Sequence, residues 1–199
     1  MNYPKTILNL IECFKKFPGI GEKTAERMAL ETLNIEDENL KLFSTSLKEV
    51  KTKIKKCEKC GSLTEDEICE VCKDKSRNNE LLCVVEEYKN VILFEKIGTY
   101  KGKYHVLGGL ISPLEGINPE DINLQKLIDR IDKENIKEII LALKPSVEGE
   151  TTSLYINKIL EEKNIKISKI AHGIPMGADI EYIDPLTLEM AINDRREIS

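Results

Sequence analysis

The spacing of four cysteines constrains what this chain can fold into more than any other feature of its sequence. Cys57, Cys60, Cys69 and Cys72 form two CxxC pairs, and the eight residues between them are mostly polar and contain little that could form an apolar core. Four thiolates spaced in this way can bind one tetrahedral ion, and Zn–S bonds supply the folding free energy that so short a segment lacks. Since protein sulfur fills all four positions, no place remains for a substrate. We therefore expect one structural Zn²⁺ per chain.

A redox dithiol is the competing interpretation of a CxxC pair. Thioredoxin-like motifs occur singly at the start of a helix that follows a strand, whereas both pairs here lie in a polar region. The sequence shows neither a signal-peptide pattern at MNYPKTILNL nor an apolar run near the roughly 20 residues that cross a bilayer. We therefore expect a cytoplasmic protein without membrane contact, whose cysteines stay reduced. Cys83, inside the apolar run 81–85, is expected to be a buried small hydrophobe.

The first 53 residues are expected to be all-helical. Apolar residues recur at three- and four-residue intervals on both sides of a break at residues 17–23, as an antiparallel helix pair with a shared apolar seam requires. The expected seam residues are Ile7, Leu10, Ile11, Phe14, Ala25, Met28, Ala29 and Leu33.

The break itself reads FPGIGEK and resembles a helix-hairpin-helix motif. Gly19 and Gly21 let the backbone approach a phosphate closely, and the start of the second helix offers free N–H groups and the positive end of the helix dipole. Lys23 and Arg27 lie four residues apart, so they share one helix face and can contact one nucleic-acid strand without reading a base. We expect these four residues to bind DNA independently of sequence. An ordinary helical hairpin, whose glycines only make the turn, is the alternative.

The charge distribution also favours an N-terminal nucleic-acid surface. The chain has 30 basic and 35 acidic residues, but residues 1–80 hold 15 of each, so the acidic excess lies wholly after residue 80. Residues 41–59 contain seven lysines and two acids. This local excess either faces a phosphate backbone or is simply a solvated helix face.

From residue 81 onward the hydrophobicity pattern of the sequence is typical of an α/β domain. Short apolar runs, which are expected strands, alternate with amphipathic stretches, which are expected helices. The apolar runs are continuous rather than alternating, which is typical of strands covered on both faces of a mostly parallel sheet. The expected strands are 81–85, 104–107, 138–143 and 165–171, and the expected helices are 89–97, 124–134 and 151–162.

Acidic residues follow two of these expected strands, where open α/β sheets carry their sites. Glu86 follows the first strand, and Glu148 and Glu150 lie in a loop after the strand that ends at Leu143. This arrangement resembles the Toprim fold of topoisomerases, primases and some nucleases. In catalytic Toprim domains the second loop carries an Asp-x-Asp pair that, with the first glutamate, holds a divalent metal beside a phosphodiester.

In this chain Lys144 and Ser146 occupy the two aspartate positions. A cation and a neutral hydroxyl in place of two hard anionic ligands remove most of the attraction for Mg²⁺, which dehydrates reluctantly. Phosphodiester chemistry is therefore not expected. Three interpretations remain open for Glu86, Glu148 and Glu150: they bind a weak ion, contact a partner protein, or solvate the loop.

The order of the motifs resembles that of the RecR family of bacterial recombination mediator proteins, over nearly the whole chain. The matching segments are PGIGEKTAER, the four-cysteine segment, VVE, GTYKGKYHVLGGLISPLEGI, KPSVEGETTSLY and GIPMGADIEY. The resemblance implies a helix-hairpin-helix domain at 1–53, a zinc finger at 54–76, a Toprim domain at 80–173, and a C-terminal Walker-B-like segment and helix at 174–199. Without a P-loop, the last segment implies little ATP chemistry.

The function that the resemblance implies is that of a DNA-repair adaptor rather than an enzyme. It would form a homo-oligomer, a dimer or a ring-like tetramer, that clamps single- and double-stranded DNA. The family acts with RecO, and in some contexts RecF, to help load the RecA recombinase at single-strand gaps. Two rival classes remain: a metal-dependent Toprim nuclease or primase that needs Glu86, and a zinc-dependent protein-interaction module without DNA affinity.

Overall fold

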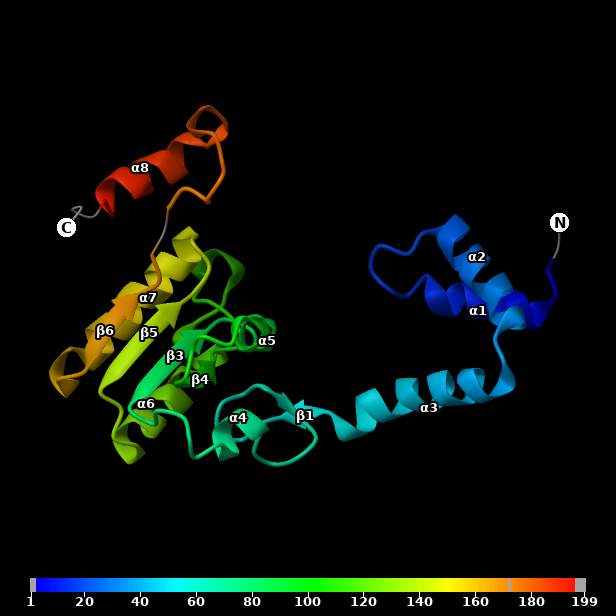
Figure 1. The fold of residues 1–199 in the computed structure, drawn as a ribbon, viewed down its shortest axis with the longest axis horizontal. Coiled ribbons are helices and arrows are strands. Elements are labelled where there is room, and N and C mark those ends of the chain that lie inside the picture. Colours follow the sequence, from blue (N-terminus) through cyan, green and yellow to red (C-terminus); the bar gives the residue numbers. More distant parts are fainter. Residues whose placement is uncertain (1–2, 172, 196–199) are drawn as a thin grey trace. The chain divides into compact units, whose positions relative to one another are not determined.

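A computed structural model describes residues 3–171 and 173–195, which divide into two compact units with the boundary between Ile54 and Lys55 (Figure 1). Residues 1–2 and 196–199, at the ends of the expected first and last domains, and residue 172 lie outside the described residues. The first unit is helical, as expected. It contains α1 (Lys5–Phe14), α2 (Glu22–Glu31), a short 3₁₀ turn (Thr32–Asn34) and α3 (Asp37–Lys53).

Helices α1 and α2 share an apolar seam, but it is narrower than the sequence pattern predicts. Ile11 and Phe14 of α1 pack against Ala25 and Ala29 of α2, and these four side chains are buried. Two of the expected seam residues are exposed, so the prediction was wrong for them. Met28 is 37% exposed because it lies beside the stripe that the two alanines define, and Leu33 is 71% exposed because the α-helical period ends before it.

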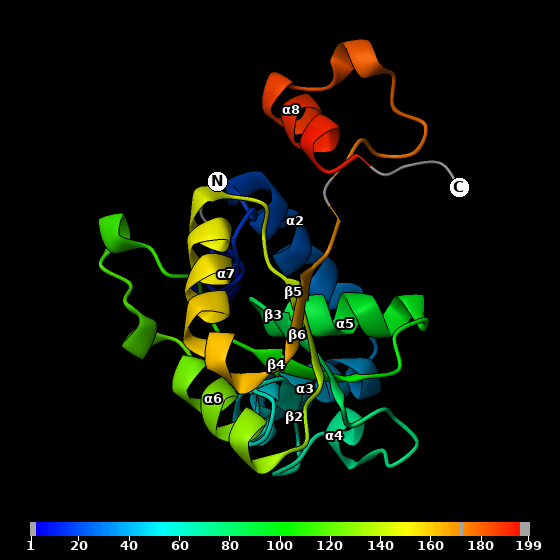
Figure 2. The same cartoon turned by 90° about the vertical axis from the view of Figure 1, so that its left-hand side faces the viewer.

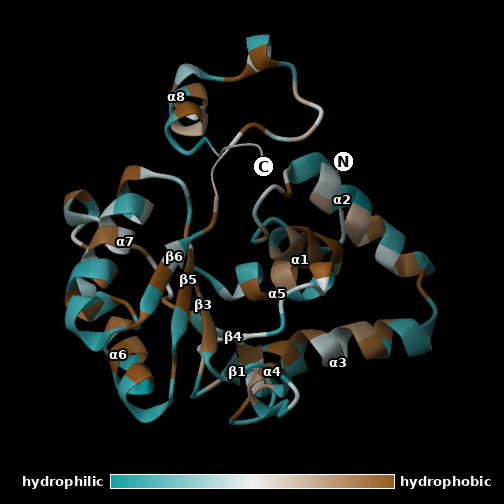
Figure 3. Ribbon diagram, turned by 60° about the vertical axis from the view of Figure 1, so that its left-hand side comes forward, coloured by the Kyte–Doolittle hydropathy of each residue, from teal (hydrophilic) through white to brown (hydrophobic). Residues whose placement is uncertain are grey.

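Helix α3 is amphipathic, and its apolar face has no cover within its unit. None of the residues in this helix, Asp37–Lys53, is buried. Hydrophobic and hydrophilic segments alternate along it in Figure 3. Asp37 and Glu38 lie in its first turn and Lys51 and Lys53 in its last, where the helix dipole favours them. The large apolar side chains left exposed are Leu42, Phe43, Leu47 and Val50.

The second unit begins with a small cysteine-bearing finger and continues into a parallel sheet. In the finger, β1 (Lys55–Lys56) pairs antiparallel with β2 (Leu63–Thr64), and α4 (Glu70–Lys73) follows. The described residues then form a four-stranded sheet in the order β4-β3-β5-β6, with every neighbouring pair parallel. The expected α/β fold class is thus confirmed. The strands are β3 (Leu81–Val85), β4 (Lys103–Val106), β5 (Glu138–Ala142) and β6 (Lys166–Lys169).

Helices cover both faces of this sheet, which explains why its central strands, β3 and β5, are largely apolar. Helices α6 (Leu124–Lys133) and α7 (Val147–Leu160) lie on one face, and α5 (Tyr88–Ile97) lies on the other (Figure 2). The β3 side chains alternate between the two cores: Leu82 and Val84 pack on the α6–α7 side, and Cys83 and Val85 on the α5 side. The burial of Cys83 confirms the prediction made for it, and burial raises the pKa of its thiol to about 12.

The structure corrects the predicted start of α7. This helix begins at Val147, four residues before the expected position, because the Ser146 hydroxyl accepts a hydrogen bond from the Gly149 N–H at 3.3 Å and caps the helix. Glu148 and Glu150 therefore lie in the first helical turn rather than in a loop. Negative charge is stabilised there by the helix dipole.

The C-terminal part of the second unit contains a 3₁₀ turn (Ile180–Tyr182) and α8 (Pro185–Asn193). The Asp184 carboxylate caps α8 by accepting the Thr187 N–H at 2.9 Å. Large apolar side chains in this segment are exposed, including Met176 and Tyr182. No helix in the described part of the chain is long and apolar enough to cross a membrane.

Candidate metal centre and nucleic-acid interface

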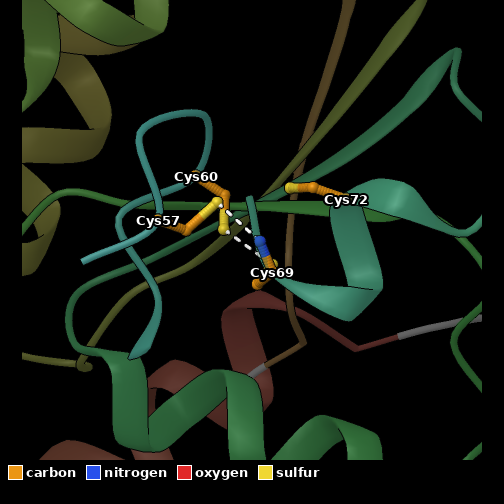
Figure 4. A group of neighbouring side chains, drawn as sticks. All are labelled: Cys57, Cys60, Cys69 and Cys72. Atoms are coloured by element: carbon orange, nitrogen blue, oxygen red, sulfur yellow. Dashed lines mark hydrogen bonds between the residues drawn. The ribbon is translucent and has the colours of Figure 1, made fainter. Parts of the chain in front are cut away.

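The four cysteines converge on one point of the finger, as Figure 4 shows. The Sγ atoms of Cys57, Cys60, Cys69 and Cys72 all lie within 4.8 Å of one another, and those of Cys60 and Cys69 are 3.6 Å apart. A tetrahedral zinc site with Zn–S bonds of about 2.3 Å places neighbouring sulfurs about 3.8 Å apart. The residues present therefore fit a zinc centre with four thiolate ligands.

Backbone hydrogen bonds hold the two knuckles in this arrangement. The Cys57 N–H donates to the Ser62 carbonyl at 2.7 Å, and the Gly61 N–H donates back to the Cys57 carbonyl at 2.9 Å, which closes the first knuckle. Cys69 is the N-cap of α4, and its N–H donates to Cys57 Sγ at 3.3 Å. The two knuckles are thus joined directly.

The electrostatics of the cluster also favour a bound cation. Hydrogen bonds from the thiols of Cys60 and Cys72 lower the pKa of the Cys69 thiol, and the hydrogen bond to Cys69 raises the pKa of the Cys60 thiol. Ionisation of one thiol thus opposes ionisation of its neighbour. A divalent cation removes this competition because it stabilises all four thiolates together. Three of the cysteines are buried, which suits a closed structural centre.

The finger is fastened to the edge strand of the sheet. The Cys60 carbonyl accepts the Val106 N–H at 2.8 Å, so the first knuckle covers part of the free edge of β4. Lys103, at the start of β4, reaches the second knuckle and donates to the Val71 carbonyl at 2.7 Å. Lys103 was not among the predicted site residues, because the strand was expected to begin at Tyr104. The sequence signal that could have indicated its role is the position of this lysine, between Gly102 and the first residue of the expected strand.

The hairpin between α1 and α2 presents an open helix N-terminus. Gly19 has a positive φ of 82°, whereas Gly21 is extended (φ −85°, ψ 173°) and is the N-cap of α2 without a side-chain cap. The first helical hydrogen bond runs from the Ala25 N–H to the Gly21 carbonyl at 2.9 Å, so the N–H groups of the first turn have no helical acceptor. A Cβ on either glycine would meet nothing within 4 Å.

Two exposed cations lie near this N-terminus and are not neutralised by an ion pair among the described residues. Lys23 and Arg27 are exposed on α2, and neither forms an ion pair with any residue that the structure describes. The nearby acid Glu22 is instead held by Lys15, at 2.5 Å. This pairing limits the negative charge next to Lys23, so the turn can attract an anion.

Among the described residues, the three acids at the sheet end are not brought together as a group of metal ligands. In the described ranges, the cysteines are the only group of three or more metal-ligand side chains close enough to hold one ion. Glu150 pairs with Lys169 at 3.0 Å, and Ser146 caps α7. At the end of β3, burial raises the pKa of Glu86, the neighbouring Glu87 raises it further, and Lys144 opposes them.

Comparison with known proteins accounts for this order of parts. Family models match residues 7–51 as the RecR helix-hairpin-helix, 54–74 as the RecR four-cysteine zinc finger domain, 80–171 as a Toprim domain and 173–196 as the RecR C-terminal region. The chain is 46% identical over 198 residues to Recombination protein RecR of Staphylococcus haemolyticus and 45% identical to that of Staphylococcus aureus, with both chains fully covered. This chain belongs to the RecR family.

Family membership confirms the resemblance that the motifs indicated, and with it the interpretation of the cysteines. The RecR zinc finger model covers all four cysteines, and their sulfurs lie at the separation that a zinc ion requires. The metal centre of this RecR-family chain is thus one structural zinc site. As its relatives' name states, the family acts in recombination.

Proposed function

We propose that this RecR-family chain is a non-catalytic mediator that clamps DNA and helps load the RecA recombinase at single-strand gaps, together with RecO and, in some contexts, RecF. The observation that carries the proposal is the cationic turn at the start of α2. There, exposed Lys23 and Arg27 carry unpaired charge, among the described residues, beside an uncapped helix N-terminus. Such a turn recognises phosphates and ignores bases, which suits a protein that must act on any sequence.

In this mode the glycines have different tasks. Gly19 is needed for its positive φ, while Gly21 is extended and has open space around it, so only an approaching ligand requires the absence of its side chain. A phosphate can then reach the backbone N–H groups of the first turn. Lys23 and Arg27 would contact the same or the neighbouring phosphate, on single- and double-stranded DNA alike.

Alanine substitutions at the two glycines should separate these tasks. Gly19→Ala is expected to lower the free energy of unfolding by about 1–2 kcal/mol, because an alanine must adopt a left-handed conformation. Gly21→Ala should change stability by less than about 1 kcal/mol but weaken DNA binding. Urea unfolding and filter binding measure the two effects. If Gly21→Ala bound DNA as wild type does, the glycines would serve only the turn, as in an ordinary helical hairpin.

Self-association is the second part of the proposal. Helix α3 exposes Leu42, Phe43, Leu47 and Val50, and the C-terminal segment exposes Met176 and Tyr182. Apolar surface of this kind favours association with further copies of the chain. In a dimer or a ring-like tetramer several hairpins act on one DNA molecule, so weak phosphate contacts combine into useful avidity.

The net negative charge of the second half of the chain favours binding of a basic protein partner. Residues 81–199 contain 20 acidic and 15 basic side chains. In the proposal Glu86, Glu148 and Glu150, at the carboxyl ends of β3 and β5, contact such a partner rather than a catalytic metal. RecO is the proposed partner at this end of the sheet.

A mass measurement in solution, with and without DNA, tests the clamp directly. We expect light scattering to give a dimer or tetramer, and a larger complex when a gapped duplex or a single strand is added. The affinity should fall steeply with salt, because phosphate contacts release counterions. A chain that stays monomeric at every concentration and binds neither the gapped duplex nor the single strand would contradict the proposal.

When the wild-type protein is incubated with Mg²⁺ and nicked, gapped or single-stranded DNA, we expect neither cleavage of the DNA nor synthesis of new strand. Lys144 and Ser146 provide no anionic ligand where catalytic Toprim domains have two, and Glu150 is paired with Lys169. A gel assay is sufficient. Magnesium-dependent turnover that Glu86→Gln abolishes would identify a Toprim nuclease or primase instead.

A further inference from the structure

Lys103 is a lysine in the interior of the protein. It begins β4, and its side chain and backbone together are only 1% exposed. Burying an ammonium group is costly unless hydrogen bonds or an opposite charge compensate for the lost hydration. No carboxylate among the described residues forms an ion pair with it. Its charge must therefore be compensated in another way.

Three backbone carbonyls of the second zinc knuckle receive its hydrogen bonds. Lys103 Nζ donates to the carbonyls of Val71 at 2.7 Å, Cys72 at 3.3 Å and Asp74 at 2.5 Å. These groups lie at the end of α4, where helix carbonyls lack intrahelical partners. An ammonium has three donors, so the knuckle and the lysine satisfy each other fully.

A zinc ion held by the four cysteines would place negative charge beside Lys103. Four thiolates around one Zn²⁺ carry a net charge of about −2, and this charge is largely buried. Cys72 provides both a sulfur ligand and one of the carbonyls that Lys103 holds. The ammonium thus contacts the backbone of a ligand residue. In these buried surroundings, water weakly screens the attraction between the ammonium and the thiolates.

The other lysines of the finger are either exposed or paired with a carboxylate. Lys59 pairs with Glu134 at 3.1 Å, and Lys73 pairs with Asp66 and Glu70. Both are also more exposed than Lys103, so water weakens their effect on the centre. Lys103 is the cation in this region that combines burial, a contact with a ligand residue and the absence of a carboxylate partner among the residues described.

We propose that Lys103 is a positioning residue of the zinc centre: its ammonium holds the second knuckle in its ligating conformation, offsets part of the negative charge of the four thiolates and thereby strengthens zinc binding. Because Lys103 belongs to β4, the same contact ties zinc occupancy to the edge of the Toprim sheet. Outer partners of this kind typically change metal affinity by about 10- to 100-fold.

Zinc affinity, measured on the full-length protein by competition with a chelator of known affinity, tests the proposal. Lys103→Met keeps the aliphatic stem and removes the charge and donors, so we expect zinc affinity to fall by about 10- to 100-fold. Lys103→Arg keeps the charge and should recover most of the loss. Lys101→Met, at an exposed lysine two residues away, is the matched control and should leave zinc affinity unchanged.

A second variant separates charge from packing and serves if Lys103→Met does not fold. Lys103→Gln retains N–H donors without the charge, and it should also bind zinc more weakly than Lys103→Arg. Hydrogen exchange should further show that zinc removal from the wild-type protein exposes the amides of β4. Zinc affinity equal to wild type in both neutral variants, even with reduced thermal stability, would overturn the proposal, because the lysine would then only fill space.

Discussion

Replacing Cys69 with serine will abolish stoichiometric zinc binding and unfold the finger between Lys55 and Lys73. Structural zinc centres contribute about 10–16 kcal/mol of apparent binding free energy at neutral pH, and this segment has little apolar core of its own to replace it. The loss should spread into the sheet, because the finger covers β4 through the hydrogen bond between the Cys60 carbonyl and the Val106 N–H. Zinc content by atomic absorption and thermal unfolding by circular dichroism measure both effects.

Cys13→Ser is the matched control for this experiment. Cys13 is exposed in the first unit and lies outside the zinc cluster, so its replacement should change neither the zinc content nor the melting temperature. Removal of zinc from the wild-type protein by a strong chelator should reproduce the Cys69→Ser result. A Cys69→Ser protein that retains one zinc per chain and melts as wild type does would refute the structural role of the centre.

Replacing both Lys23 and Arg27 with alanine is expected to weaken DNA binding by at least an order of magnitude in an oligomer that uses several hairpins at once. The loss should be uniform across sequences, since phosphate contacts read no bases. The dependence of log affinity on log salt should also become shallower, by about 0.9 per duplex phosphate contact removed and about 0.7 per single-strand contact. Filter binding at several salt concentrations gives both quantities.

Two further lysine pairs make this experiment specific. Lys126 and Lys158 are exposed on α6 and α7, and their double alanine variant should bind DNA as wild type does. Lys48→Ala with Lys51→Ala tests the alternative that the lysine-rich stretch on α3 contacts DNA. If the Lys23 and Arg27 variant kept both its affinity and its salt slope, the hairpin would not be the DNA site. A wild-type protein without DNA affinity at any salt concentration would be a zinc-dependent interaction module instead.

Features that depend on neighbours along the chain could be predicted from the sequence. The cysteine spacing is sufficient to indicate a tetrahedral site, because two CxxC pairs bring their own sulfurs together within a few residues. The β3 run was predicted with its observed bounds, Leu81–Val85, since a continuous apolar run of that length is typical of a strand buried on both faces. The open turn at Gly19 and Gly21 was likewise visible, because proline and glycine interrupt a helical period locally.

Features that depend on contacts between distant segments were decided only by the tertiary structure. Met28 fits the helical period as well as Ala29 does, yet only packing against α1 determines which of the two is buried. The sequence groups Glu150 with other acids, whereas the structure pairs it with Lys169 of β6. Lys103 is the clearest case, since a lysine in a lysine-rich sequence is normally solvated. Its burial follows from the docking of the finger on the β4 edge, which places three backbone carbonyls around one ammonium and so compensates for part of its lost hydration.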